Sequence, residues 1–167
     1  IAAAEFANIA ERRIARMVDH KLSDLPPFLV SDSGVNSGFM IPQYTAAALV
    51  SENKVLAHPS VVDSIPTSAN QEDHVSMGGY SARKARQILN NTNRVIAIEM
   101  VNAAQGMDFR APLKPGKGSG AAYAEFRKHV PFYEKDQFMQ PLLLKSLELV
   151  ENGTMVEAVE KEIGELK

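Results

Sequence analysis

The stretch VSMGGYSARKARQILNNTNRVIAIEMVNAAQGMD, residues 75–108, decides the fold class. It reads as one continuous helical pattern, weakened in its first turns by Gly78-Gly79 and apolar from Val95 to Ala104. At about 1.5 Å per residue, such a helix is about 50 Å long. A compact globule of this chain length is only about 40 Å across. The long helix therefore predicts an elongated bundle that packs against other chains or against further parts of its own chain.

Helical patterns also occupy most of the chain on either side of this stretch. Alternating apolar and polar residues, the mark of a strand, are nearly absent. The sequence therefore predicts an all-α fold. Besides residues 75–108, the expected helices run over residues 1–22, 42–57, 121–129, 135–152 and 155–163.

Three further local patterns carry expectations. Residues 42–57 are apolar around most of the helix circumference, which is typical of a helix buried on several sides. Two prolines and three glycines between residues 111 and 120 predict a loop. The first helical pattern is already under way at Ile1, with no capping residue before it. This uncapped start predicts a piece of a longer polypeptide.

Composition excludes several classes of function. The 18 basic and 20 acidic residues give a net charge of −2, so there is no broad positive field for a nucleic-acid backbone. No apolar run approaches the length of a transmembrane helix. The absence of cysteine removes disulfides, thiolate metal sites and a thiol nucleophile, and it fits a reducing compartment. The four histidines have no metal-binding spacing, so we expect no metal site.

The segment SIPTSANQEDHVSM, residues 64–77, is the richest in polar side chains. Five consecutive residues from Asn70 to His74 can form hydrogen bonds, just before the predicted long helix. A helix N-terminus adds free backbone N–H groups and the positive end of a dipole, a setting that suits a carboxylate or an amino acid. The alternative is a capping loop, with Asp73 or a neighbour as the cap.

A cluster of basic residues and one glutamate can each be interpreted as structural or as functional. Arg83, Lys84 and Arg86 form either a solvated face or a site for a carboxylate. Glu99, inside the apolar run, lies on an exposed stripe, pairs at an interface or acts in catalysis. Pairing or exposure is the favoured interpretation, because an unpaired buried carboxylate is costly.

The string TSANQEDHVSM, residues 67–77, resembles the aromatic amino acid lyase family, and within it the histidine ammonia-lyases. Three other stretches agree with this family in order and spacing. They are ERRIARMVDHKLSDLPPFLV (residues 11–30), GVNSGFMIPQYTAAALVSENKVLAHPSVVDS (residues 34–64) and AIEMVNAAQGMDFR (residues 97–110). Beyond Arg110, the chain resembles the family only in being helical.

The resemblance implies a cytoplasmic homotetramer of long, nearly parallel helices, acting on a small amino acid substrate. Residues 1–110 would form part of the central long-helix bundle, and residues 111–167 a C-terminal helical segment. The histidine enzymes eliminate ammonia from L-histidine to give trans-urocanate. Their electrophile is a methylidene-imidazolone (MIO) group, formed from an internal Ala-Ser-Gly. This chain has no such tripeptide, and Gly118-Ser119-Gly120 lies in the wrong region to replace it. We therefore expect the chain to be the C-terminal third of the enzyme, inactive in isolation.

Four site residues follow from the resemblance. Glu72 matches the family's catalytic glutamate at the side-chain end of the substrate, and Gln71 beside it would orient it or bind substrate. Met40 matches a pocket-wall position that carries lysine in plant phenylalanine ammonia-lyases. Tyr44 stands one helical turn later, where the histidine enzymes more often have smaller side chains. Tyr44 therefore leaves open a tyrosine or phenylalanine ammonia-lyase or 2,3-aminomutase. The long apolar helices leave open a non-catalytic helical assembly module.

Overall fold

The computed structural model describes residues 1–62 and 64–166. The described residues form helices and no strand, and a single bridge pairs Thr67 with Glu72. The all-α prediction is therefore confirmed. The helices are α1 (Ala2–Val18), α2 (His20–Ser23), α3 (Met40–Leu56), α4 (Gly78–Phe109), α5 (Lys117–His129), α6 (Gln140–Glu151) and α7 (Thr154–Ile163), with short 3-10 turns at η1 (Pro27–Leu29) and η2 (Ser68–Asn70).

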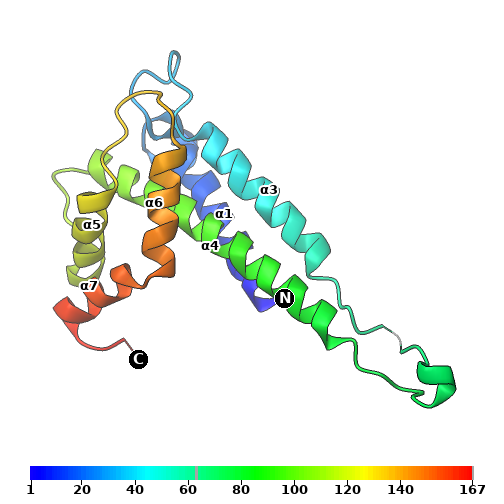
Figure 1. The fold of residues 1–167 in the computed structure, drawn as a ribbon. Helices are drawn as coiled ribbons and strands as arrows, with labels where there is room; N and C mark the ends of the chain where they lie inside the picture. The colour runs from blue at the N-terminus through cyan, green and yellow to red at the C-terminus, as the bar shows by residue number, and fades with distance from the viewer. Residues whose placement is uncertain (63, 167) are drawn as a thin grey trace.

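The helices α1, α3 and α4 lie side by side and give the molecule its long axis (Figure 1). With 32 residues, α4 is about 47 Å long. Alanines bring the three backbones close together, and larger side chains fill the space between them. This first core consists of Ala7, Ala10, Ile14, Ala46, Val50, Val95 and Ile98.

The helices α5, α6 and α7 gather at one end of α4, where α6 packs on α4 and α5 packs on α7 (Figure 1). A second core fills this end of the molecule. Its most buried large side chains are Leu29, Phe39, Phe126 and Leu149. Gly118 allows the close packing of α5 on α7, because a Cβ there would lie 3.1 Å from the Cδ1 atom of Ile163.

Several predicted helix boundaries are wrong by a few residues. The first helix ends at Val18, and the four-residue α2 follows it. The helix α5 begins at Lys117, inside the glycine-rich stretch that predicted a loop. The helix α6 begins at Gln140 rather than near residue 135. Glycine and proline content indicates where a chain turns, but tertiary contacts decide the last turn of each helix.

The expected burial of α3 on several sides is also wrong within this chain. The helix buries Pro42, Ala46, Val50 and Asn53. Apolar side chains on its other faces are open to solvent: Ile41 is 61% exposed, Tyr44 71% and Val55 70%. The reason is that α1 and α4 cover only one side of α3.

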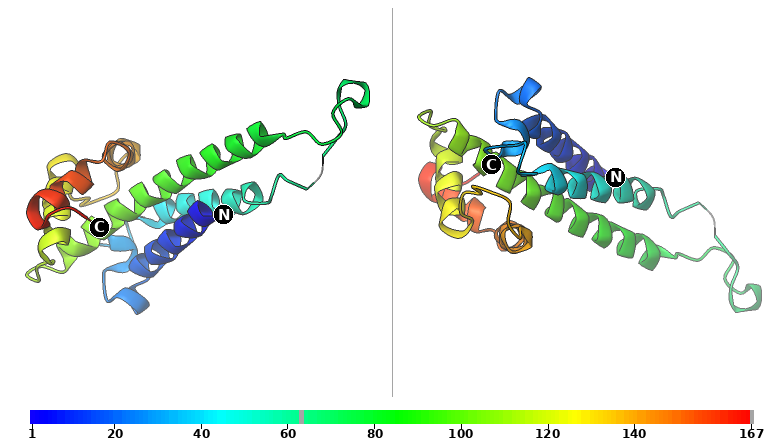
Figure 2. Two further views of the ribbon diagram at one scale, coloured as in Figure 1. Left: turned by 90° about the horizontal axis from the view of Figure 1, so that it is seen from below. Right: turned by 90° about the horizontal axis from the view of Figure 1, so that it is seen from above.

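The connection between α3 and α4 is a long arm that projects beyond the ends of both helices in every view (Figure 2). It carries η2 at its tip and large exposed apolar side chains along its length. These are Val61, Val62, Ile65 and Met77. Of the helices described, none has the length and apolar character needed to cross a membrane.

Candidate functional site

The tip of the arm has an unusual backbone. Its three residues Ser68–Asn70 are not glycines, yet their φ angles lie between +52° and +68°. Each left-handed residue of this kind costs about 1–2 kcal/mol. The turn is closed by hydrogen bonds from the Thr67 N–H to the Glu72 carbonyl (2.9 Å) and from the Gln71 N–H to the Ser68 carbonyl (3.2 Å). Strained backbone of this kind clusters at ligand sites, which makes the tip a candidate site.

The strained turn presents Glu72 and Gln71 to solvent. Both side chains are exposed. The Glu72 carboxylate accepts one long hydrogen bond, of 3.5 Å, from the Thr67 hydroxyl. Among the residues that the structure describes, no cation lies within ion-pair distance of Glu72. Its oxygens are therefore free to accept hydrogen bonds from a ligand.

The expected helix N-terminus next to these residues is not there. The helix α4 begins at Gly78, with Met77 at the N-cap position and no capping side chain. Asp73 is therefore not the cap. The backbone N–H of Val75 instead donates to the Ser64 hydroxyl (2.8 Å), which ties the two sides of the arm together. Glu72 thus lies six residues before α4, away from the helix dipole.

Met40 lies at the far end of α3 from the arm. It is the first residue of the helix and is half-buried, and Tyr44 follows one turn later on the same side. The 17 residues of α3 separate Met40 from the arm by about 24 Å along the helix axis. Glu72 and Met40 of one chain are therefore too far apart to contact the same amino acid.

The start of α3 carries contacts that the sequence did not reveal. Asp136, in the segment that leads into α6, accepts hydrogen bonds from the backbone N–H groups of Ser37 (2.7 Å) and Gly38 (2.9 Å). These bonds lower the pKa of Asp136, whereas burial raises the pKa of its neighbour Tyr133. No local pattern signals this pairing, because the two segments are about 100 residues apart in sequence.

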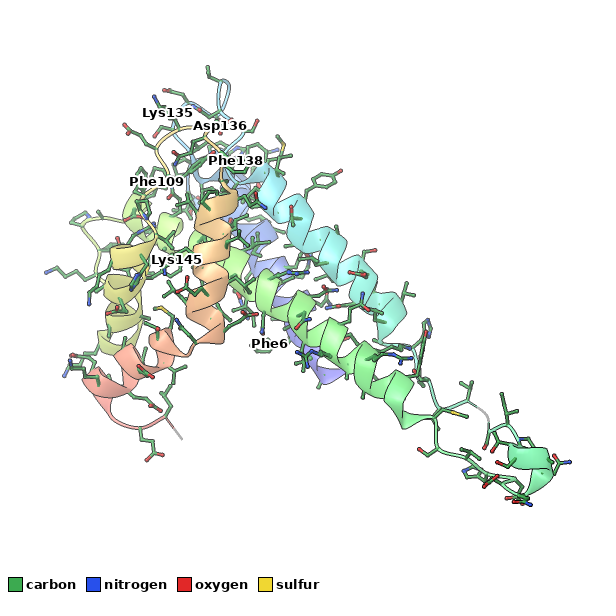
Figure 3. The ribbon with its side chains drawn as sticks, in the orientation of Figure 1. Phe6, Phe109, Lys135, Asp136, Phe138 and Lys145 are labelled. Carbon is green, nitrogen blue, oxygen red and sulfur yellow. The ribbon has the colours of Figure 1, made fainter. Side chains whose placement is uncertain are left out.

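A cavity of about 460 Å³ lies where these two segments meet. Its walls come from the start of α3, from the segment before α6 and from the first turn of α6. They include Ile41, Thr45, Tyr133, Asp136, Phe138 and Leu143. The side chains of Asp136 and Phe138 lie together in this region (Figure 3).

Glu99, Arg83 and Lys84 of α4 each have a structural partner in this chain. Glu99 forms an ion pair with Arg13 of α1, which confirms that Glu99 is paired and raises the pKa of Arg13 through their hydrogen bond. The Arg83 guanidinium lies 5.4 Å from the centre of the Tyr80 ring, and Lys84 donates to the carbonyl of His58. These contacts support the solvated-face interpretation of the basic cluster.

The residues present do not fit the methylidene-imidazolone group. The sequence contains no Ala-Ser-Gly. Gly118-Ser119-Gly120 lies in the first turns of α5, where the Ser119 hydroxyl donates to the carbonyl of Gly116 (3.2 Å). Helical backbone with this local hydrogen bond offers no loop that could cyclise, so we assign no step of a reaction to such a group here.

Curated relatives share the sequence over its whole length. A histidine ammonia-lyase of Clostridium tetani is 56% identical, over an alignment that covers 98% of this chain and 32% of that protein. A histidine ammonia-lyase of Natranaerobius thermophilus is 55% identical over all of this chain and 33% of its own length. The chain thus spans about a third of the relatives it matches. The likeness also continues beyond Arg110, so the expected end of the resemblance there is wrong.

Solved structures share the fold. A histidine ammonia-lyase from Trypanosoma cruzi matches with a TM-score of 0.91 and 46% identity, over 95% of this chain and 31% of that one. A tyrosine aminomutase from Streptomyces globisporus matches with the same TM-score and 35% identity, over 96% of this chain and 31% of that one. A model of the aromatic amino acid lyase family matches residues 1–128, which is most of the sequence. On sequence and fold together, the chain belongs to the aromatic amino acid lyase family.

Proposed function

We propose that this chain is the C-terminal third of a histidine ammonia-lyase, an enzyme that eliminates ammonia from L-histidine to give trans-urocanate. The observation that carries the proposal is the strained turn Ser68–Asn70. It presents the exposed Glu72 carboxylate at the tip of the arm, with no cation of the described residues within ion-pair distance. The higher identity to histidine ammonia-lyases, 55–56%, than to the tyrosine aminomutase, 35%, supports histidine as the substrate.

The chemistry of Glu72 suits an imidazole. A carboxylate accepts a hydrogen bond from an imidazole N–H, and beside a cationic ring it stays ionised. A phenyl ring offers no such donor. Gln71, exposed next to Glu72, has both a donor and an acceptor with which to orient the carboxylate or bind substrate.

A related enzyme acting on tyrosine or phenylalanine, as a lyase or a 2,3-aminomutase, is the second candidate. Tyr44 favours it, because its exposed hydroxyl lies one helical turn from Met40 and would add a polar group to a pocket there. The likeness in fold is equal for both candidates, since both structures match with a TM-score of 0.91.

The proposed enzyme is a cytoplasmic homotetramer in which each substrate site draws on more than one copy. Two features of the chain support this. Met40 begins α3 and Glu72 lies on the arm beyond the other end of that helix, and large apolar side chains on α1, α3 and the arm are exposed. Among them are Phe6, labelled in Figure 3, and Ile9, Ile41 and Val61. Residues 1–110 would form part of the central helix bundle of the tetramer, and residues 111–167 a C-terminal helical segment.

The test is product formation by the full-length polypeptide that carries this chain. The polypeptide is given L-histidine, L-tyrosine or L-phenylalanine. The unsaturated acid is detected by its ultraviolet absorbance, and a β-amino acid is separated from its substrate by chromatography. Urocanate as the main product would support the proposal. Coumarate, cinnamate or a β-amino acid as the main product would overturn it in favour of the second candidate. The isolated 167-residue chain is expected to form no product from any of the three.

A further inference from the structure

Asp136 joins two segments that lie far apart in sequence. Its two carboxylate oxygens accept from the backbone N–H groups of Ser37 (2.7 Å) and Gly38 (2.9 Å). Its own backbone N–H donates to the Oδ1 atom of Asn36 (3.0 Å). Asp136 lies in the segment that enters α6, above the start of α3 (Figure 3). Three hydrogen bonds therefore fix the backbone immediately before Met40.

The Asp136 carboxylate is itself held in place by the second core. The Tyr133 hydroxyl donates to Asp136 (3.3 Å), and it accepts from the N–H of Gln137 (3.0 Å). The Tyr133 ring is buried edge-on against Phe39, with centroids 5.4 Å apart. The buried Gln105 side chain bonds both the N–H (3.1 Å) and the carbonyl (2.7 Å) of Tyr133. Rigid contacts thus run from α4 to the carboxylate.

The backbone before α3 has little freedom to take another path. Gly38 has a φ of +53°, and a Cβ there would lie 2.5 Å from the Phe28 carbonyl oxygen. The same oxygen accepts from the N–H of Phe39 (2.9 Å), and the N–H of Met40 donates to the Ser37 carbonyl (3.2 Å). Met40 is therefore presented from a backbone whose position depends on Asp136.

We propose that Asp136 is a positioning residue for the substrate site: it holds the backbone of Ser37 and Gly38, and so sets where Met40 lies. This inference rests on the proposed function, in which Met40 forms a wall of the substrate pocket. Asp136 acts through the backbone and does not touch the substrate. Because the two N–H groups lower its pKa, the carboxylate stays ionised near neutral pH and both charge-assisted bonds persist.

The first test is the Asp136→Asn variant of the full-length polypeptide. The amide turns an NH₂ group toward one backbone N–H, so one of the two bonds is lost. Loss of a bond to a charged group predicts a rise in KM for L-histidine of about 5- to 20-fold, with kcat within about threefold of wild type. Glu134→Gln is the matched control, since it removes a nearby exposed carboxylate with no hydrogen bond among the residues described. Its KM should equal that of wild type.

A double-mutant cycle tests whether the effect passes through Met40. In a Met40→Ala background, Asp136→Asn should raise KM by less than about twofold, because the side chain that it positions is gone. An unchanged KM in Asp136→Asn alone overturns the proposal. Equal effects with and without Met40 overturn it too, as does a loss of kcat with no change in KM.

Two further provisions make the experiment decisive in every case. If Asp136→Asn does not fold, Asn36→Ala replaces it. That variant removes the acceptor for the Asp136 N–H and the bond that the Asn36 amide donates to the Ser31 carbonyl (3.2 Å), and it leaves the Asp136 carboxylate in place. The cycle uses whichever amino acid the wild-type polypeptide converts. Turnover of tyrosine in place of histidine would thus overturn the proposed function while leaving the role of Asp136 to be decided by the cycle itself.

Discussion

Glu72 is the residue on which the proposed chemistry depends. Among the residues described, its exposed carboxylate accepts one long hydrogen bond, from the Thr67 hydroxyl, so a substrate meets little competition for it. The neighbouring carboxylate of Asp73 is also exposed. Glu72 and Asp73 therefore differ in their position on the turn and not in their charge. Variants of each residue can show which carboxylate the reaction needs.

Replacing Glu72 by alanine in the full-length polypeptide should lower kcat/KM for L-histidine by about 10²- to 10⁴-fold, the range for a lost acid–base or transition-state contact. Steady-state kinetics with urocanate detection measures the effect. Asp73→Asn, which removes the next charge along the chain, should change kcat/KM by less than about threefold. A loss below tenfold in Glu72→Ala would reduce Glu72 to a structural residue of the turn.

A charge introduced at Met40, the first residue of α3, tests whether this residue borders the substrate. Met40→Lys places a positive charge beside a substrate whose imidazole ring becomes cationic on protonation, so KM for histidine should rise by about tenfold or more. Ser51→Lys adds the same charge to an exposed position near the other end of α3 and should leave KM unchanged. Equal KM values for the two variants would place Met40 outside the pocket.

At the scale of the elements, the loop before α3 depends on Gly38. A Cβ added there would lie 2.5 Å from a backbone oxygen, and a φ of +53° is costly for alanine. Gly38→Ala should therefore lower the free energy of unfolding by about 2 kcal/mol or more. Denaturant unfolding of the full-length polypeptide measures it.

Gly79 is the matched control for this substitution. It lies in the first turn of α4, and a Cβ there has no described neighbour within 4 Å. Gly79→Ala should leave stability unchanged or raise it by about 0.5 kcal/mol. Similar losses of stability in both variants would contradict the role given to Gly38.

Some of the elements could be predicted from the sequence, and some of the contacts between them could not. The long helix was predictable because its apolar pattern is local: α4 runs over Gly78–Phe109, against an expected 75–108. The hydrogen bonds between Asp136 and the loop before α3 were not predictable, because they join residues about 100 positions apart. Asp73 looked like a cap because Asp is a good N-cap residue, yet tertiary bonds such as that from Val75 to Ser64 keep this segment out of the helix.

For the candidate site, the sequence identified residues but not their arrangement. Glu72 and Met40 are site candidates because the stretches around them resemble the lyase family. Such a resemblance does not give the distance between the two residues. Only the structure shows Met40 at the start of a 17-residue helix and Glu72 on the arm beyond its other end. Tyr44 is similar: its place one turn after Met40 follows from the sequence, while its 71% exposure depends on which helices cover α3.

At the scale of the whole molecule, the elongated shape and the projecting arm suggest that this chain completes its sites with other copies (Figures 1 and 2). Glu72 belongs to this arm and is exposed, outside both cores of its own chain. We therefore expect each substrate site to combine Glu72 of one copy with Met40 of another.

The most direct test is urocanate formation by a mixture of two full-length variants, Glu72→Ala and Met40→Lys, dissociated and reassembled together. The substrate is L-histidine at a concentration where each variant alone, treated identically, is slow. If the two residues come from different copies, random mixing restores intact sites and about a quarter of the wild-type rate. A rate no higher than the mean of the two variants alone would contradict the claim, since it would mean that one chain supplies both residues to a site.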